Sequence, residues 1–320
     1  MTAEIESDFQ KRPRVSVVVP LLNEQDSLRE LAGAVKSALE PRFTYELIFV
    51  DDGSTDRSWN VIEQIKAEGF PVRAMRFRRN YGKSMALAKG FEMAGGDFVA
   101  TMDADLQDDP AEFPAMIDMI ETDNLDLVSG WKKIRHDPMS KTIPSRFFNW
   151  VTSRATGIGL HDFNCGLKVY RREVVQNIEL YGEMHRYIPA LAKWEGFEAI
   201  GEKVVTHHPR KFGKTKFGLS RFINGFLDLL TLLFINVYFQ RPMHFFGSLG
   251  VGFVSAGSII TIYLVYMRIF YDQYLSNRPL LLFGALFILL GLQFFSVGFL
   301  GEMLIKSRKR KRAANIRTTI

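Results

Sequence analysis

The chain has 320 residues, of which 47% are hydrophobic and 24% are charged, and its formal net charge at pH 7 is +6. Two stretches, 242–267 and 279–301, contain no Asp, Glu, Lys or Arg. At a rise of about 1.5 Å per residue, a helix of either length would cross a hydrocarbon layer of about 30 Å. The composition therefore excludes a purely soluble enzyme.

The excess positive charge is concentrated at the C-terminal end. Seven basic residues and no acid follow Glu302: Lys306, Arg308, Lys309, Arg310, Lys311, Arg312 and Arg317. This distribution disfavours a nucleic-acid binder and favours a basic segment beside a membrane. The single cysteine, Cys165, cannot form an intrachain disulfide, so the chemistry needs no oxidising compartment. Residues 1–12 lack the apolar segment of a cleaved signal peptide.

The first 125 residues alternate short apolar runs with amphipathic stretches. The runs predict buried strands at residues 15–19, 47–50, 72–77 and 98–102. The stretches between them predict helices at residues 25–38, 56–68 and 82–94. Alternation of this kind predicts an α/β fold, with a mostly parallel sheet covered by helices on both faces. Such a sheet binds its ligands at the carboxyl ends of the strands.

The spacing loosens between residues 126 and 205, where we expect substrate-binding loops. Further strands are expected at 126–130, 167–170 and 202–205, and a basic helix at 141–156. Residues 211–240 combine a basic, glycine-containing loop with an apolar helix that Arg221 and Asp228 interrupt, which predicts helices lying along the membrane surface.

The two charge-free stretches predict two transmembrane helices joined by the loop 268–278. Two crossings bring both ends of the chain to one side of the membrane. The basic tail assigns that side to the cytoplasm. We therefore expect a cytoplasmic catalytic domain at 1–210, a basic loop and interfacial helices at 211–241, two spans at 242–305 and a basic tail at 306–320.

Three predicted strands end in polar residues that suit a nucleotide, at 20–24, 51–56 and 103–109. Carboxylates at a strand end can accept hydrogen bonds from a base or a ribose. Two carboxylates that are separated by one residue in a tight loop can hold Mg²⁺ or Mn²⁺. Asp103, Asp105 and Gln107 alternate directly after a buried strand, which favours a ligand site over mere solvation.

Other polar residues in these loops have simpler interpretations. Asp56 is expected to begin the helix that follows it, and Asp108 and Asp109, just before Pro110, to begin the next helix. For Asp52, a ligand contact and ordinary Gly-Ser turn chemistry are equally favoured. The two histidines at 207 and 208 lack zinc-ligand spacing and are interpreted as loop residues.

Taken together, the motifs are similar to those of a known family. They read Val-Val-Pro-x-x-Asn-Glu, Val-Asp-Asp-Gly-Ser-Thr-Asp, Arg-Asn-Tyr-Gly-Lys, Met-Asp-Ala-Asp-Leu-Gln-Asp-Asp-Pro and Asp-Phe-Asn-Cys-Gly. In this order they resemble family 2 glycosyltransferases of the GT-A fold. Within that family the chain resembles polyprenyl-phosphate glycosyltransferases, which include dolichyl-phosphate mannose synthases and bacterial undecaprenyl-phosphate glucosyltransferases. The resemblance covers nearly the whole chain, including the basic loop 210–216 and the two apolar segments.

The resemblance implies a site with three parts. The donor nucleotide would be bound by Pro20, Asn23, Glu24, Asp52, Asn80, Lys83, Asp103, Ala104, Arg210 and Lys216. A divalent cation, Mg²⁺ or Mn²⁺, would be held by Asp105 and Gln107 and would neutralise charge on the leaving nucleoside diphosphate. The acceptor phosphate would be bound by Lys132, Lys141 and Ser145, although relatives often have Arg at the first two positions.

Asp103, Asp105 and Asp162 are the catalytic candidates that the resemblance implies. A phosphomonoester is already largely ionised at neutral pH, because its second pKa is near ~6, so it needs little deprotonation. Asp162 is therefore expected mainly to orient groups or to balance positive charge. For the basic loop at Arg210 and Lys216, attraction to anionic lipid headgroups is the alternative interpretation.

The sequence thus predicts an inverting glycosyltransferase of the inner (cytoplasmic) membrane that moves one sugar from a UDP- or GDP-linked donor to a polyprenyl phosphate. One alternative is a non-catalytic membrane component that binds or transports nucleotide sugars, which the intact set of acids disfavours. Another is a processive polysaccharide synthase, which needs more spans and a Gln-x-x-Arg-Trp element that this chain lacks. The sugar, the nucleotide and the lipid length stay open, and so does the oligomeric state, a homo-oligomer included.

Overall fold

The structure is a computed structural model that describes residues 12–133, 149–180, 182–209, 242–272, 274 and 279–309. The chain divides into two units, Met1–Asp228 and Leu229–Ile320. The interfacial helices expected within 211–241 and the basic tail beyond 309 lie outside the described residues.

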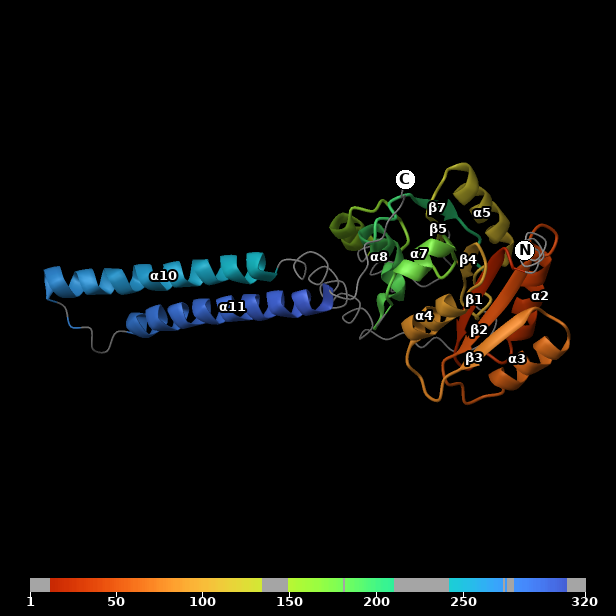
Figure 1. The fold of residues 1–320 in the computed structure, drawn as a ribbon, viewed down its shortest axis with the longest axis horizontal. Helices are drawn as coiled ribbons and strands as arrows, with labels where there is room; N and C mark the ends of the chain where they lie inside the picture. The colour runs from red at the N-terminus through yellow and green to blue at the C-terminus, as the bar shows by residue number, and fades with distance from the viewer. Residues whose placement is uncertain are drawn as a thin grey trace, which may run out of the picture. The chain divides into compact units, whose positions relative to one another are not determined.

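The first unit is built on a seven-stranded sheet with the order β3-β2-β1-β4-β6-β5-β7 (Figure 1). Its strands are β1 (Val15–Leu21), β2 (Tyr45–Asp51), β3 (Val72–Arg76), β4 (Phe98–Thr101), β5 (Leu127–Trp131), β6 (Lys168–Arg171) and β7 (Ile200–Val204). The strands β1 to β4 pair in parallel, as do β5 and β7, whereas β6 runs antiparallel to both β4 and β5. The expected mostly parallel sheet is confirmed, and each expected strand is present.

Helices cover both faces of this sheet (Figure 1). All seven residues of β1 are buried, and Val17 and Val19 contribute to one core while Val18 contributes to the other. The first core is completed by α2 (Leu28–Leu39), α3 (Ser58–Ala67) and α5 (Phe113–Thr122). The second is completed by α4 (Lys83–Met93), α7 (Arg172–Asn177) and α8 (Ile188–Trp194). A strand buried on both faces reads as a continuous apolar run, which is why it was recognisable in the sequence.

Two of these helices, α7 and α8, were not among the expected elements, and α5 was expected only as the helix after Pro110, without bounds. A signal for its extent was present, because Phe113, Met116, Ile117 and Ile120 recur at helical spacing and all four are buried. The helices α7 and α8 are only 6 and 7 residues long, too short to show a period. Of the basic helix expected at 141–156, the described part, residues 149–156, is helical.

The second unit is a pair of long helices, α10 (Pro242–Tyr271) and α11 (Pro279–Lys309), which lie side by side (Figure 1). Both are long and apolar enough to cross a membrane. Their backbones approach closely at glycines, because a Cβ on Gly257 would lie 2.6 Å from the carbonyl oxygen of Gly284. Many large apolar side chains, such as Ile262 and Leu282, face away from the partner helix. That arrangement suits lipid better than water.

Candidate active site

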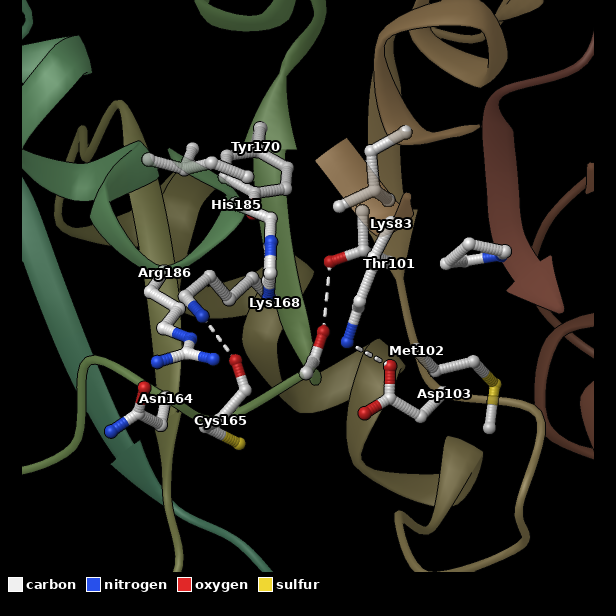
Figure 2. A pocket seen from close by; sticks show the side chains of 14 residues that line it. Lys83, Thr101, Met102, Asp103, Asn164, Cys165, Lys168, Tyr170, His185 and Arg186 are labelled. Carbon is white, nitrogen blue, oxygen red and sulfur yellow. Dashed lines mark hydrogen bonds and ion pairs between the residues drawn. The ribbon is translucent and has the colours of Figure 1, made fainter. Parts of the chain in front are cut away.

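A pocket opens beside the carboxyl end of β4. Its lining includes three residues that the sequence assigned to the donor site: Pro20 within β1, Lys83 at the start of α4, and Asp103 just after β4. Residues from the distant segments 164–170 and 185–188 complete it (Figure 2). The fold therefore brings the strand-end acids together with a second set of side chains from later in the chain.

An ion pair between Lys83 and Asp103 lies in this pocket, where the lysine Nζ donates to the Asp103 Oδ1 (Figure 2). Desolvation by the surrounding protein would raise the pKa of Asp103. The nearby Lys83 ammonium outweighs that effect, with smaller contributions from Lys132 and His185, and holds the pKa well below its ordinary value. Asp103 is therefore a carboxylate at neutral pH whose charge is already engaged by Lys83.

The segment after β4 shows the alternation that the sequence suggested. Asp103, Asp105 and Gln107 are partly exposed, whereas the intervening Ala104 and Leu106 are buried. The turn includes Leu106 in the left-handed conformation, with φ at 59°, and the Gln107 backbone N–H donates to the Asp105 Oδ1 at 3.3 Å. Three residues with potential oxygen ligands are thus partly exposed in one short loop.

This loop fits a divalent cation that keeps ligands from elsewhere. The Asp105 carboxylate and the Gln107 amide oxygen are partly exposed and are of the ligand type that Mg²⁺ and Mn²⁺ bind. Within the described residues, no group of three or more His, Cys, Asp or Glu side chains gathers as a metal cage. Few protein ligands are the usual pattern for Mg²⁺, which retains water and phosphate oxygens.

Asn23, expected at the donor, also ties two strand-end loops together. Its backbone adopts a φ of 56°, and its N–H donates to the Ser54 Oγ at 2.9 Å. Its side-chain Oδ1 accepts from the Thr55 N–H at 2.8 Å. The loop after β1, which continues to Glu24, is thereby joined to the loop after β2.

Asp52 is buried and fixes the segment that leads into α4. Its two carboxylate oxygens accept the backbone N–H groups of Tyr81 and Gly82 at 2.7 and 2.9 Å. Burial raises the pKa of Asp52 above its ordinary value, the two hydrogen bonds oppose this, and neighbouring Asp51 adds to it. Asp52 therefore positions the stretch that carries the exposed Asn80 and the pocket residue Lys83.

Two of the acids expected to begin helices do so, and one does not. Asp56 accepts the N–H of Ser58 at 2.9 Å at the start of α3. Asp109 accepts the N–H of Ala111 at 2.9 Å and caps the helical turn η1 (Pro110–Glu112). Asp108 is instead buried, and its Oδ1 lies 2.6 Å from the Lys132 Nζ. The expectation that Asp108 begins a helix is wrong. Its carboxylate is buried, and a buried carboxylate is stabilised by pairing with a cation, here Lys132.

Lys132, assigned by resemblance to the acceptor phosphate, lies against the acidic segment after β4. Its side chain is only 15% exposed. Burial would lower its pKa, but the Asp108 carboxylate raises the pKa above its ordinary value, so the ammonium stays charged. Of the other residues assigned by resemblance, Lys141, Ser145, Arg210 and Lys216 lie outside the described residues.

Asp162 is fully buried and is not part of the pocket lining. Its Oδ1 accepts the Asn164 N–H at 3.1 Å, and its own N–H donates to Glu202 at 3.1 Å. The next residues of the same loop do line the pocket, and Gly166 lies so close to Asp103 that a Cβ there would be 2.9 Å from the carboxylate carbon. Asp162 thus shapes the loop that borders Asp103.

The pocket lining also includes three charged or titratable residues to which the sequence assigned no role: Lys168, His185 and Arg186 (Figure 2). Lys168 is buried, and its Nζ donates to the carbonyl oxygens of Cys165 and Phe163. Burial lowers the pKa of Lys168. A basic residue in a buried strand was the one available signal for it.

His185 belongs to η2 (Met184–Tyr187), and its Nδ1 lies 3.0 Å from the Ser84 Oγ. Because Ser84 directly follows Lys83, this contact joins η2 to the start of α4. Arg186 pairs with Glu183 at 3.3 Å. Adjacent His and Arg residues in a sequence, without a surrounding motif, do not indicate that they line a pocket.

Comparison with protein families and curated proteins adds to this geometry. Residues 16–179 match the model of glycosyl transferase family 2. A dodecaprenyl-phosphate galacturonate synthase from Rhizobium johnstonii is 40% identical over 304 residues, which cover 94% of this chain and 90% of that protein. An undecaprenyl-phosphate 4-deoxy-4-formamido-L-arabinose transferase from Pseudomonas fluorescens is 35% identical, with coverage of 91% and 84%.

Solved structures with a similar fold include glucosyl-3-phosphoglycerate synthase from Mycobacterium tuberculosis. It has a TM-score of 0.53 and 21% identity, and the alignment covers 74% of this chain and 84% of that one. The same enzyme in complex with Mn²⁺ and UDP-glucose has a TM-score of 0.51 at 21% identity, covering 74% and 83%. This likeness supports the GT-A fold expected for the first unit.

Proposed function

Because this chain belongs to glycosyl transferase family 2, we propose that it is an inverting glycosyltransferase that moves a single sugar from a nucleoside diphosphate sugar to a polyprenyl phosphate. The observation that carries the proposal is a likeness to the galacturonate synthase that extends over 94% of this chain. The likeness therefore includes the apolar helices as well as the pocket. The acceptors named for both curated relatives are polyprenyl phosphates.

In this proposal the strand-end loops bind the donor. Pro20, Asn23, Glu24, Asp52 and Ala104 contact the nucleotide, with Asn80, Lys83, Asp103 and, from the basic loop, Arg210 and Lys216 around it. A divalent cation at Asp105 and Gln107 would supply positive charge to the leaving nucleoside diphosphate. Lys83 keeps Asp103 ionised. The donor therefore binds beside an ion pair of Lys83 and Asp103, and not beside an unpaired carboxylate.

The transfer step needs little proton chemistry from the protein. An ionised oxygen of the acceptor phosphate attacks the anomeric carbon, and the bond from that carbon to the diphosphate oxygen breaks with its electron pair. Attack from the opposite face inverts the anomeric configuration. Lys132, Lys141 and Ser145 bind the acceptor phosphate in this scheme, and Asp162 positions the loop beside Asp103.

The two apolar helices keep the enzyme with its lipid substrate. We propose that α10 and α11 each cross the bilayer, with both chain ends in the cytoplasm and the domain boundaries expected from the sequence. The donor is water-soluble, whereas the acceptor's isoprenoid tail stays in the lipid. Transfer therefore has to take place at the height of the lipid headgroups.

The test is a donor panel assayed with membranes that contain the full-length chain. UDP- and GDP-linked sugars, UDP-galacturonate among them, are incubated with undecaprenyl phosphate, and labelled sugar is counted in the lipid phase. Product is expected with one donor class and only when Mg²⁺ or Mn²⁺ is present. Donor binding without lipid-phase product from any donor would favour the alternative, a non-catalytic nucleotide-sugar-binding component.

Asp105→Ala tests the metal assignment in the same assay. Loss of a cation ligand removes stabilisation of the leaving group, so turnover should fall at least ~100-fold while the protein stays folded. Asp109→Asn is the matched control, since Asp109 belongs to the same acidic segment but caps a helical turn. Undiminished turnover of Asp105→Ala, or full activity of the unmodified enzyme in excess chelator, would contradict the assignment.

A further inference from the structure

The side of α11 that faces away from α10 carries a stripe with its own regular spacing. Its positions follow one another at alternating intervals of four and three residues: Leu282, Leu286, Leu289, Gln293, Ser296 and Leu300. This is the heptad spacing that keeps one seam of a helix turned toward a partner helix. The four leucines are 49 to 75% exposed. The side that packs on α10 uses a separate heptad of glycines, at 284, 291 and 298.

One member of the stripe, Gln293, is a polar residue near the middle of the span Pro279–Leu304. Its side chain is exposed, and none of the hydrogen bonds between described residues involves it. The neighbouring Ser296 differs, because its Oγ donates to the Leu292 carbonyl at 3.1 Å. A glutamine amide has two donor hydrogens and an acceptor oxygen. Lipid chains satisfy neither, and an unpaired polar group in hydrocarbon is costly.

We propose that this stripe is the contact surface between two copies of the chain, with their α11 helices packed in parallel and the two Gln293 amides bonded to each other. Copies with the same topology place Gln293 at the same depth, so each amide finds a complementary amide without adjustment. The flanking leucines then meet leucines at equal depth, and the polar pair fixes the register. The proposal rests on the membrane-spanning arrangement proposed above and not on transferase activity.

Cross-linking of the full-length protein in phosphatidylcholine vesicles tests the surface. Gln293→Cys, Leu289→Cys and Leu300→Cys should each give a disulfide-linked dimer when copper phenanthroline takes two electrons from a pair of thiols. Leu292→Cys is the matched control, because Leu292 is 55% exposed at the same depth but lies about 100° around the helix. Unmodified protein, with its buried Cys165, sets the background. Equal cross-linking at 292 and 293, or none at any stripe position, would overturn the proposal.

The role of the amide is tested by energy transfer between labelled copies as the vesicles are diluted with lipid. Gln293→Leu should weaken association about 3- to 30-fold, and Gln293→Asn should largely restore it. Unchanged association of Gln293→Leu would overturn the amide pairing. Resistance of the protein to carbonate extraction is measured alongside. A resistant protein that stays monomeric refutes the dimer alone, whereas an extractable protein refutes the spanning arrangement and with it this proposal.

Discussion

At Gly166 the backbone approaches the Asp103 carboxylate more closely than any side chain would allow. A Cβ there would lie 2.9 Å from the Asp103 Cγ, and the Gly166 carbonyl oxygen accepts a hydrogen bond from the Thr101 hydroxyl at 2.9 Å. Gly166→Ala should therefore displace Asp103 and lower kcat by about 100-fold, because small displacements at a reacting centre are costly.

Gly159→Ala is the control for this change, since nothing lies within 4 Å of a Cβ at that position. Steady-state kinetics and thermal melting of both variants check the prediction. Wild-type kcat in a folded Gly166→Ala protein would show that the close approach has no part in turnover.

Lys83 sets the pH range over which Asp103 is ionised. The ammonium holds the pKa of Asp103 below its ordinary value, so the carboxylate stays charged as the pH falls through that value. In Lys83→Met the pKa of Asp103 should rise, and residual kcat/KM should decline on the acid side at a higher pH than in the wild type. A pH profile of kcat/KM measures this, and an unshifted acid limb in Lys83→Met would argue against the coupling.

The same pair should contribute to stability with a definite sign. Because the folded-state pKa of Asp103 is lowered, the stabilisation is present above the unfolded-state pKa of ~3.9 and is lost as the pH falls toward the folded-state value. The two side chains are 30% and 37% exposed, so solvent screening limits the effect to about 1 kcal/mol or less. Urea unfolding of wild type and Lys83→Met at pH 7 and at low pH would show the difference shrinking in acid.

At the scale of elements, glycine sets the spacing of α10 and α11. A Cβ at Gly257 would lie 2.6 Å from the Gly284 carbonyl oxygen, so a larger residue forces the helices apart. Gly257→Leu should destabilise the hairpin by about 1–3 kcal/mol, as overpacking usually does. Gly252→Leu on the same helix should leave the stability of the hairpin unchanged, since nothing lies within 4 Å of a Cβ at that position. Thermal melting in detergent compares them, and equal melting of the two variants would contradict the glycine contact.

At the scale of the whole molecule, the distribution of charge predicts the orientation in the membrane. Seven basic residues follow Glu302, whereas the loop between the helices has Arg268 and Arg278 against Asp272. Arg268 and Asp272 moreover pair at 3.0 Å, which reduces the effective charge of the loop. Both termini should therefore be cytoplasmic and the loop should face the opposite side.

A tag after Ile320 should resist an impermeant label in intact cells, and a tag at Asn277 should react with it. Labelling of the C-terminal tag in intact cells would overturn the orientation. It would also overturn the use of a cytosolic donor, because the donor-site residues precede the first span.

Local patterns in the sequence were enough to predict the sheet, the two long helices and the acidic residues at the strand ends. Buried strands such as β1 read as apolar runs because both of their faces are covered. The structure keeps the predicted alternation, with Asp103, Asp105 and Gln107 partly exposed and the residues between them buried. In so short a loop, the local backbone conformation determines which side chains are exposed. A helix after Pro110 was also expected, and the periodic residues of α5 could have given its extent.

Tertiary structure alone decided which side chains meet. The insertion of β6 antiparallel between β4 and β5 brings Lys168 to the pocket, and the packing of η2 on α4 brings His185 and Arg186 there. Asp108 and Lys132, 24 positions apart, become a buried ion pair through the same folding. A sequence specifies spacing along one chain, whereas contacts between distant residues depend on how strands order themselves to bury apolar surface, and no local period encodes that order.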